Sequence, residues 1–343
     1  MISIQTSSLY RDQIRQLAAS ITMPAGATVL VTGATGLVGS CLVDVLAATD
    51  TGIRVIATSR SLERLTQRFE YLLNDERIKL MRWDAADPLH CDDPVDYVIH
   101  AASNASPSLY EAHPVQTLLT NVEGTRHVLD FCQDKGARML LTSTFEVYGN
   151  VIASPQGLQE DAPYTADLST PRSCYPESKR CAEVLIQSYA SEFGTDALIA
   201  RLGSVYGPTM LDSDNKAHAQ FFRKALAKQD IVMNSAGLPR RTYSYVIDVA
   251  SALLFLLVHG ETAQAYNVAS SGESASIAEI AEHIAHIAGT YVQKPELSES
   301  DALQTAPNHT LNGAKIHALG WASAYSLDEG LRSTIAILQQ SSE

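Results

Sequence analysis

Four residues in the middle of the chain combine side chains that could move a proton. Tyr175 and Lys179 are four positions apart at the start of a predicted helix, so they share one face of it. A free tyrosine, with a pKa of about 10, is a poor base at neutral pH, but a nearby ammonium group stabilises its phenolate. Upstream, an apolar stretch ends in Ser143 and Thr144. Thr144, or else Ser143, could hydrogen-bond a substrate oxygen facing Tyr175, which predicts acid–base chemistry at a hydroxyl or carbonyl group.

A glycine-rich loop precedes these residues. In the segment VTGATGLVG (31–39), Gly33, Gly36 and Gly39 recur at every third position between a predicted strand and a predicted helix. Such glycines allow a sharp turn, a close approach to a diphosphate and tight packing of the helix, whose first N–H groups attract phosphate oxygens. We therefore predict a dinucleotide site that also includes Thr35 and Leu37. The spacing is not G-x-G-x-x-G, and a tight turn without a ligand is the alternative.

The end of the second predicted strand bears on the choice of cofactor. A carboxylate at this point would bind the ribose 2′-hydroxyl of NAD, but the chain has Ser59 and Arg60. These two residues favour NADP over NAD without excluding NAD, because an arginine at the end of a strand is often simply solvated. Asp84, after the third strand, is a candidate for the adenine edge.

The elements that must position these residues alternate regularly. Short apolar runs at 28–31, 54–58, 79–82, 95–100, 139–142 and 197–201 are separated by helical patterns. This alternation predicts an α/β fold, a Rossmann-type doubly wound parallel sheet with a smaller C-terminal α/β substrate-binding lobe. We expect a lead segment over 1–24, and a cofactor domain over 25–203 that also takes in about 243–268. The lobe is expected to comprise 204–242 and 269–343.

Composition narrows the classes of partner. The 343 residues are 45% hydrophobic and carry a formal charge of −13, which disfavours nucleic acid and anionic membranes. The five cysteines form no C-x-x-C, and the histidines form no metal-binding pattern, so we expect no metal. With no signal-like start and no apolar run long enough to span a bilayer, we expect a cytoplasmic protein.

Seven segments together resemble a known family. They are VTGATGLVG, VIHAASNASP, TNVEGTRHVL, TSTFEVYG, PRSCYPESKRCAE, RLGSVYGP and RRTYSYVIDVA. The chain resembles an extended short-chain dehydrogenase/reductase of the NAD-dependent epimerase/dehydratase family, whose members act on nucleotide sugars. PRSCYPESKR, EVYG and HAASNASP are most similar to its UDP-glucuronate decarboxylase branch.

The resemblance implies roles for individual residues. Tyr175 would be the catalytic base and acid, Lys179 would bind the nicotinamide ribose, and Thr144 would align the sugar hydroxyl. The segment Ala101, Ala102 and Ser103 would lie along the cofactor, with Ser103 also near the sugar. The resemblance further implies a homodimer that pairs through the Tyr175 helix.

Four positions bear on the reaction. Glu146 could exchange a proton at C3 or C5 of the sugar, or only cap a turn. Phe145 replaces the aspartate of related 4,6-dehydratases and the serine of the decarboxylases, so 4,6-dehydration is disfavoured. Ser204 replaces an asparagine that contacts the sugar nucleotide, and Arg241 matches an arginine that could hold a phosphate or a carboxylate.

From these positions we expect a nucleoside-diphosphate sugar to be modified through a transient 4-keto intermediate. Epimerisation comes first, and the alternatives are UDP-glucuronate-type decarboxylation and NADPH-dependent 4-keto reduction. A catalytically idle protein that senses the nicotinamide redox state is the alternative from another class.

Overall fold

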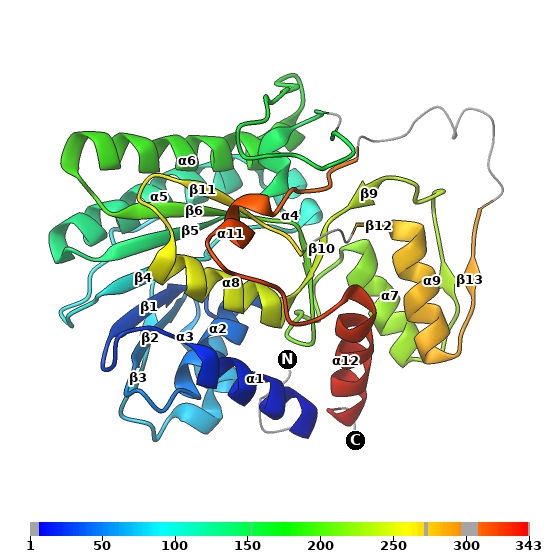
Figure 1. The fold of residues 1–343 in the computed structure, drawn as a ribbon, viewed down its shortest axis with the longest axis horizontal. Coiled ribbons are helices and arrows are strands. Elements are labelled where there is room, and N and C mark those ends of the chain that lie inside the picture. The colour runs from blue at the N-terminus through cyan, green and yellow to red at the C-terminus, as the bar shows by residue number, and fades with distance from the viewer. Residues whose placement is uncertain (1–6, 152, 271–273, 296–307, 342–343) are drawn as a thin grey trace.

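A parallel sheet of seven strands forms the centre of the computed structural model, which describes residues 7–151, 153–270, 274–295 and 308–341. The strand order is β11-β6-β5-β4-β1-β2-β3 (Figure 1). The strands are β1 (Thr28–Thr32), β2 (Arg54–Ser59), β3 (Ile78–Arg82), β4 (Tyr97–His100), β5 (Arg138–Thr144), β6 (Ala197–Leu202) and β11 (Ala265–Val268). The chain reverses its direction of progress between β1 and β4, and ligands of such sheets bind at the carboxyl ends of the strands near this point.

Helices cover both faces of the sheet, because the central strands carry apolar side chains that are buried on both faces. On one face lie α5 (Pro114–Lys135) and α6 (Cys174–Phe193), with α4 (Pro107–Ala112) beside them. On the other face lie α1 (Ser8–Ser20), α2 (Leu37–Ala47), α3 (Leu62–Arg68) and α8 (Val246–His259). The predicted fold class is therefore confirmed.

A smaller lobe stands at the carboxyl edge of the sheet (Figure 1). Its helices are α7 (Ala217–Leu226), α9 (Ile277–Ala288) and α12 (Leu327–Gln340), and α11 (Ala314–Ala318) packs beside β11. Its short strand pairs are β7 (Ser204–Tyr206) with β10 (Tyr243–Tyr245), β8 (Ile231–Val232) with β13 (Val292–Gln293), and β9 (Arg240–Arg241) with β12 (Ala275–Ser276). Chain stretches before and after α8 thus build one lobe, while α8 and β11 complete the main sheet domain.

Two local features differ from the sequence expectation. Residues 7–24, expected as part of a lead segment, contain α1, which buries Tyr10, Ile14 and Leu17 against α2 and α8. The helical pattern after β2 is interrupted, since α3 ends at Arg68 and a 3₁₀ turn follows over Glu70–Leu72.

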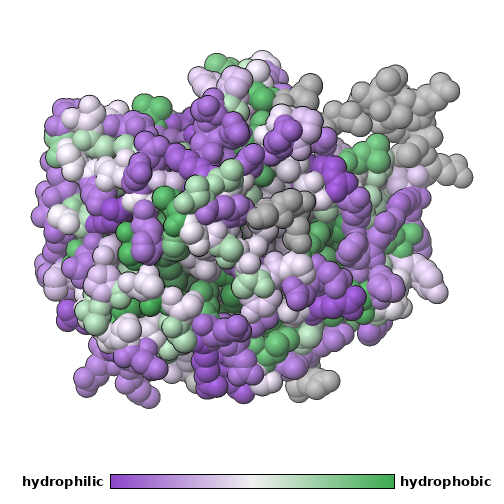
Figure 2. Space-filling model, viewed as in Figure 1, coloured by the Kyte–Doolittle hydropathy of each residue, from purple (hydrophilic) through white to green (hydrophobic). Residues whose placement is uncertain are grey.

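No helix within the described residues is long and apolar enough to cross a membrane. Hydrophilic side chains cover most of the face seen in Figure 2.

Candidate active site

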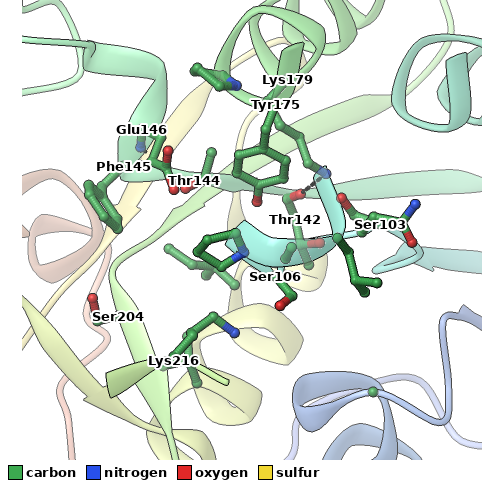
Figure 3. Close-up of a pocket in the computed structure, with 18 of the residues that line it drawn as sticks. Ser103, Ser106, Thr142, Thr144, Phe145, Glu146, Tyr175, Lys179, Ser204 and Lys216 are labelled. Carbon is green, nitrogen blue, oxygen red and sulfur yellow. Dashed lines mark hydrogen bonds between the residues drawn. The ribbon is translucent and has the colours of Figure 1, made fainter. Parts of the chain in front are cut away.

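One cleft of about 1040 Å³ runs along the carboxyl edge of the sheet and beneath the lobe. Every predicted site residue lines it, and Figure 3 shows several of them from different elements facing the same space. The set comprises Gly33, Thr35, Gly36, Leu37, Gly39, Ser59, Arg60, Asp84, Ala101, Ala102, Ser103, Thr144, Phe145, Glu146, Tyr175, Lys179, Ser204 and Arg241. The fold therefore gathers residues that are up to about 200 positions apart in the chain.

The glycine loop has the shape of a phosphate cradle. Gly33 has a φ of 65°, and a Cβ there would come within 2.6 Å of the Ala101 carbonyl oxygen. A Cβ on Gly39 would collide with the carbonyl oxygen of Gly33. Gly36 is the N-cap of α2 and has no side chain to occupy the space above the helix end. The exposed N–H groups and the open cradle fit a dinucleotide diphosphate.

A buried threonine fixes the next loop beside the cradle. The Thr32 hydroxyl accepts hydrogen bonds from the backbone N–H groups of Ala101 and Ala102, both at 3.1 Å. The same hydroxyl lies 2.8 Å from Nδ1 of His100. Burial and the nearby Lys179 lower the pKa of His100 to about 3, so its imidazole is neutral at physiological pH. These hydrogen bonds fix the loop after β4 beside the glycine loop, where a bound dinucleotide is expected to lie.

The far end of the cleft bears two arginines. Arg60 is exposed at the end of β2, and Arg64 of α3 lines the same part of the cleft. Thr35 and Ser59 bring their hydroxyl oxygens within 3.3 Å of each other at the base. The Asp84 carboxylate accepts the backbone N–H of Ala86 at 3.1 Å. Sequence reasoning missed Arg64, although its place in the first turn after Arg60 could have indicated it.

Tyr175 is held in the first turn of α6 with its hydroxyl toward the cleft (Figure 3). Its hydroxyl lies near the side chains of Thr144 and Ser103, and both lower its pKa. Ser143 points elsewhere, because its hydroxyl donates to Glu183 at 2.5 Å. The structure therefore selects Thr144 from the two hydroxyls that the sequence left open.

The electrostatics of the tyrosine differ from the sequence expectation. Burial and the nearby Glu146 raise the pKa of Tyr175 above its ordinary value, whereas an adjacent ammonium was expected to lower it. The Lys179 ammonium instead donates to the backbone carbonyl of Thr142 at 2.9 Å. Burial lowers the pKa of Lys179 to about 8. The correction follows from desolvation, which dominates when both groups are buried.

A buried hydrogen-bond chain, which sequence reasoning missed, supports this group. The Ser103 hydroxyl donates to Asn121 at 2.8 Å, and the Asn121 amide donates to Ser178 at 2.9 Å. Ser178 in turn donates to the backbone carbonyl of Tyr175 at 2.9 Å. The segment TNVEGTRHVL thus contributes Asn121 from α5, fixing the first turn of α6 relative to the loop after β4.

At the lobe end of the cleft Glu146 lies near several cations, one of which, Lys216, pairs with Asp214 at 3.2 Å. Burial raises the pKa of Glu146, while Arg172, Arg241 and Lys216 oppose that rise. Arg172 approaches the Glu146 carboxylate at 3.5 Å. The Arg241 guanidinium lies 5.6 Å from the ring centre of Phe145. Sequence reasoning missed Arg172 and Lys216, which lie in irregular segments.

Ser204 also lines this end of the cleft, at the start of β7 (Figure 3). Within the described parts of the chain, no group of three or more His, Cys, Asp or Glu side chains is placed to hold a metal ion.

Comparisons with known proteins agree with this geometry. The NAD dependent epimerase/dehydratase family matches residues 29–269. UDP-glucuronic acid decarboxylase 6 of Arabidopsis thaliana is 33% identical over 307 residues, covering 88% of this chain and 86% of that protein. UDP-glucuronic acid decarboxylase 1 of Xenopus tropicalis is 31% identical over 309 residues, covering 90% of this chain and 71% of that protein.

Solved structures share the fold. A UDP-glucose 4-epimerase from Thermotoga maritima, solved with UDP-glucose, superposes with a TM-score of 0.76 at 23% identity and covers 92% of this chain and 100% of its own. The enzyme WbmF of Bordetella bronchiseptica, in complex with NAD⁺ and UDP, gives a TM-score of 0.73 at 22% identity, covering 91% and 92%. The predicted resemblance is confirmed: the chain is an enzyme of the NAD-dependent epimerase/dehydratase family, an extended short-chain dehydrogenase/reductase.

Proposed function

We propose that this enzyme removes carbon dioxide from a nucleoside-diphosphate hexuronic acid through a transient 4-keto sugar. The observation that carries the proposal is Arg241, which lines the cleft near Glu146 and forms no ion pair among the described residues, whereas Arg172 and Lys216 are paired with carboxylates of the protein. A neutral hexose offers Arg241 no anion beyond its diphosphate, whereas a hexuronic acid adds a carboxylate that an arginine can bind. The names of the curated relatives support the same reaction.

The residues of the cleft can perform the first proton transfer. Tyr175, whose phenol must first lose its own proton against the rise in pKa that burial imposes, takes the proton of the C4 hydroxyl, which Thr144 aligns. A bound nicotinamide dinucleotide would accept the hydride from C4, and Lys179 would hold its ribose. The carboxylate is then β to the new ketone, so the C5–C6 bond breaks and its electron pair passes into an enolate. The Tyr175 phenol and the Thr144 hydroxyl donate hydrogen bonds to this enolate oxygen.

A panel of substrates tests the reaction. Purified protein is incubated with UDP-glucuronate, UDP-glucose and the corresponding dTDP-, GDP- and CDP-sugars, with and without NAD(P)H, and products are followed by mass spectrometry. Loss of carbon dioxide from a hexuronic acid is the expected result. Arg241→Gln should lower the rate on the hexuronic acid at least tenfold, whereas Arg332→Gln, on the outer surface of α12, should not. Turnover confined to neutral sugars, or of none, overturns the proposal.

Epimerisation, which the sequence alone places first, is now the second candidate, and Phe145 favours it. This side chain is 9% exposed and cannot donate a proton, where the decarboxylases that the chain resembles have a serine. An epimerase needs only Tyr175, Thr144, Lys179 and a cofactor that returns its hydride to the other face of C4. In the same panel, an isomer of unchanged mass identifies epimerisation, and stoichiometric use of NADPH identifies a reductase.

We further propose that the cofactor is NADP. Arg60 and Arg64 offer two cations where an NAD enzyme would have a carboxylate, and they suit a 2′-phosphate. The family description and the NAD-bound relatives favour NAD, so the two cofactors must be compared directly. Arg60→Ala and Arg64→Ala should each weaken NADPH binding about tenfold and leave NADH binding unchanged. Arg54→Ala, at the opposite end of β2, is the control; equal losses for both cofactors would contradict the proposal.

We also propose a homodimer formed by α5 and α6 of two copies. Exposed apolar side chains project from these helices, among them Val115 and Val184, which are 71% and 61% exposed. The resemblance to extended short-chain enzymes supports a second copy as the partner. Light scattering should give a dimer for the native chain and a monomer for Val184→Glu, and a monomeric native chain would contradict this proposal.

A further inference from the structure

A second tyrosine lies directly against the predicted catalytic one. Tyr110 belongs to α4 and is 1% exposed. Its ring is stacked on that of Tyr175, with the centroids 5.1 Å apart and the planes inclined by 10°. Together with Cys174, these two rings form a small buried cluster separate from the main cores of the sheet domain. The contact is therefore local to the site.

The Tyr110 ring also contacts a cation. The guanidinium carbon of Arg172 lies 5.6 Å from the ring centroid. Arg172 is held there by two carboxylates, Glu111 at 3.6 Å and Glu146 at 3.5 Å. Tyr110 thus contacts both a cation and the predicted base.

Backbone contacts hold Tyr110 in this position, whereas its hydroxyl does not. The Cys174 thiol donates to the Tyr110 carbonyl oxygen at 3.6 Å, tying α4 to the first turn of α6. The Tyr110 hydroxyl is buried and has no hydrogen-bond partner among the described residues. The ring, rather than the hydroxyl, therefore makes the contacts that could act on Tyr175.

Stacking matters for Tyr175 because of where its hydroxyl must point. The hydroxyl lies near the side chains of Thr144 and Ser103, and rotation of the side chain about χ1 would carry it away from both. A buried ring that packs in parallel on Tyr175 restricts this rotation. Misplacement of a reacting group by about 1 Å can lower a rate about a hundredfold, so such a restriction affects turnover more than binding.

We propose that Tyr110 is a positioning residue, whose ring, backed by Arg172, keeps the Tyr175 hydroxyl directed at Thr144 and the substrate oxygen. This inference rests on the proposed role of Tyr175 in the reaction. It also assigns a task to α4, a short helix whose Tyr110 packs on the ring of Tyr175. Arg172 would then connect Glu146, with which it forms an ion pair, to Tyr175, which it reaches through the Tyr110 ring.

Kinetics of Tyr110→Leu and Tyr110→Phe test the proposal. The leucine variant removes the flat ring, and we expect kcat to fall ten- to a hundredfold with KM and cofactor affinity within about twofold. The phenylalanine variant keeps the ring, so kcat should stay within about threefold and its pH profile should be unchanged. Tyr291→Leu, at an exposed tyrosine in the lobe, is the matched control.

Three results overturn the inference. They are unchanged kcat in Tyr110→Leu, an equal loss in Tyr110→Phe, and a parallel loss of cofactor affinity that would show general unfolding of the site. A spectroscopic arm needs no sugar substrate. In ring-labelled protein, the Tyr175 resonance, assigned by its absence from Tyr175→Phe, should lose its ring-current shift in Tyr110→Leu but not in Tyr110→Phe. If no nucleotide sugar is turned over, the proposed function fails, while this shift still decides whether Tyr110 orients Tyr175.

Discussion

Neighbouring hydroxyls on β5 serve different purposes. Successive side chains of a strand point to opposite faces, so the Ser143 and Thr144 hydroxyls meet different partners although both residues line the cleft. The Ser143 hydroxyl donates to Glu183, whose carboxylate also accepts from Arg201 at 2.7 Å. The Thr144 hydroxyl lies near Tyr175 and accepts the backbone N–H of Glu146 at 3.2 Å. The Ser143 hydroxyl therefore helps to pack α6 on the sheet, whereas the Thr144 hydroxyl belongs to the candidate active site.

Substituting the two hydroxyls separately should give opposite phenotypes. Thr144→Val should lower kcat at least tenfold with little change in the free energy of unfolding. Ser143→Ala should keep kcat within about threefold but lower the free energy of unfolding by about 1–3 kcal/mol, because a buried carboxylate loses a donor. Steady-state kinetics and urea denaturation of both variants check this. If Ser143→Ala lost more kcat than Thr144→Val, Ser143 rather than Thr144 would be the hydroxyl that serves the reaction.

The element that shapes the cofactor site is the turn between β1 and α2. Gly39→Ala places a methyl group against the Gly33 carbonyl, so we expect the helix end to move and dinucleotide affinity to fall at least tenfold. Gly52→Ala is a matched control, since Gly52 has a φ of 72° but open space around it. It should lose some stability through backbone strain and keep its affinity. Calorimetric binding of NADH and NADPH measures the difference, and equal losses at both glycines would contradict it.

Helix α1 is anchored by a buried ionic network. Asp44 of α2 is fully buried and accepts hydrogen bonds from Tyr10 at 2.7 Å and Tyr71 at 2.5 Å, and it pairs with Arg68 of α3. Arg68→Met would leave a buried carboxylate without its cation, so we expect the free energy of unfolding to fall by about 3–5 kcal/mol. Arg126→Met, in an exposed pair with Asp130, should change it by less than about 1 kcal/mol. A similar loss in both variants would mean that the buried pair contributes no more than a surface pair.

At the scale of the whole molecule, buried histidines make stability depend on pH. Burial lowers the pKa of His100 to about 3 and that of His218 to about 4. In the unfolded chain both titrate near pH 6.5, so below that pH the unfolded chain binds protons that the folded protein does not. The free energy of unfolding should therefore fall between pH 6.5 and about 4, by up to about 1.4 kcal/mol per pH unit for each histidine.

Urea denaturation of the native chain and of His218→Gln at pH 7 and pH 5 checks this dependence. The variant should show the shallower decrease in the free energy of unfolding between the two pH values. Equal decreases would mean that His218 is protonated in the folded protein.

The net negative charge of the chain also affects how the whole molecule attracts ligands. The chain has a formal charge of −13, yet seven arginines and lysines line the cleft beside five aspartates and glutamates, and the face seen in Figure 2 is largely hydrophilic. Anionic ligands are therefore attracted by local groups rather than by the field of the protein as a whole. The expected exclusion of nucleic acid stays a prediction.

Much of the fold and part of the site follow from the sequence alone. Buried parallel strands must be continuous apolar runs, which is why β1, β2, β5 and β6 could be located closely. The glycines of 31–39 and the four-residue spacing of Tyr175 and Lys179 are short-range patterns, which can be recognised in the sequence without the structure. Even α1 is amphipathic, but its burial depends on α2 and α8, which only the fold brings to it.

Tertiary structure decided which residues meet. Asn121 and Tyr110 lie far from Tyr175 in the chain, in segments whose patterns say nothing of it, yet each contributes to its surroundings. The direction of the Tyr175 pKa shift was equally hidden, since burial depends on every element packed around the ring. Sequence determined the strands, the glycine turn and the reacting pair because these depend on neighbours along the chain. The order of the strands and the docking of α4 on α6 determined the rest, because contacts between distant segments exist only after folding.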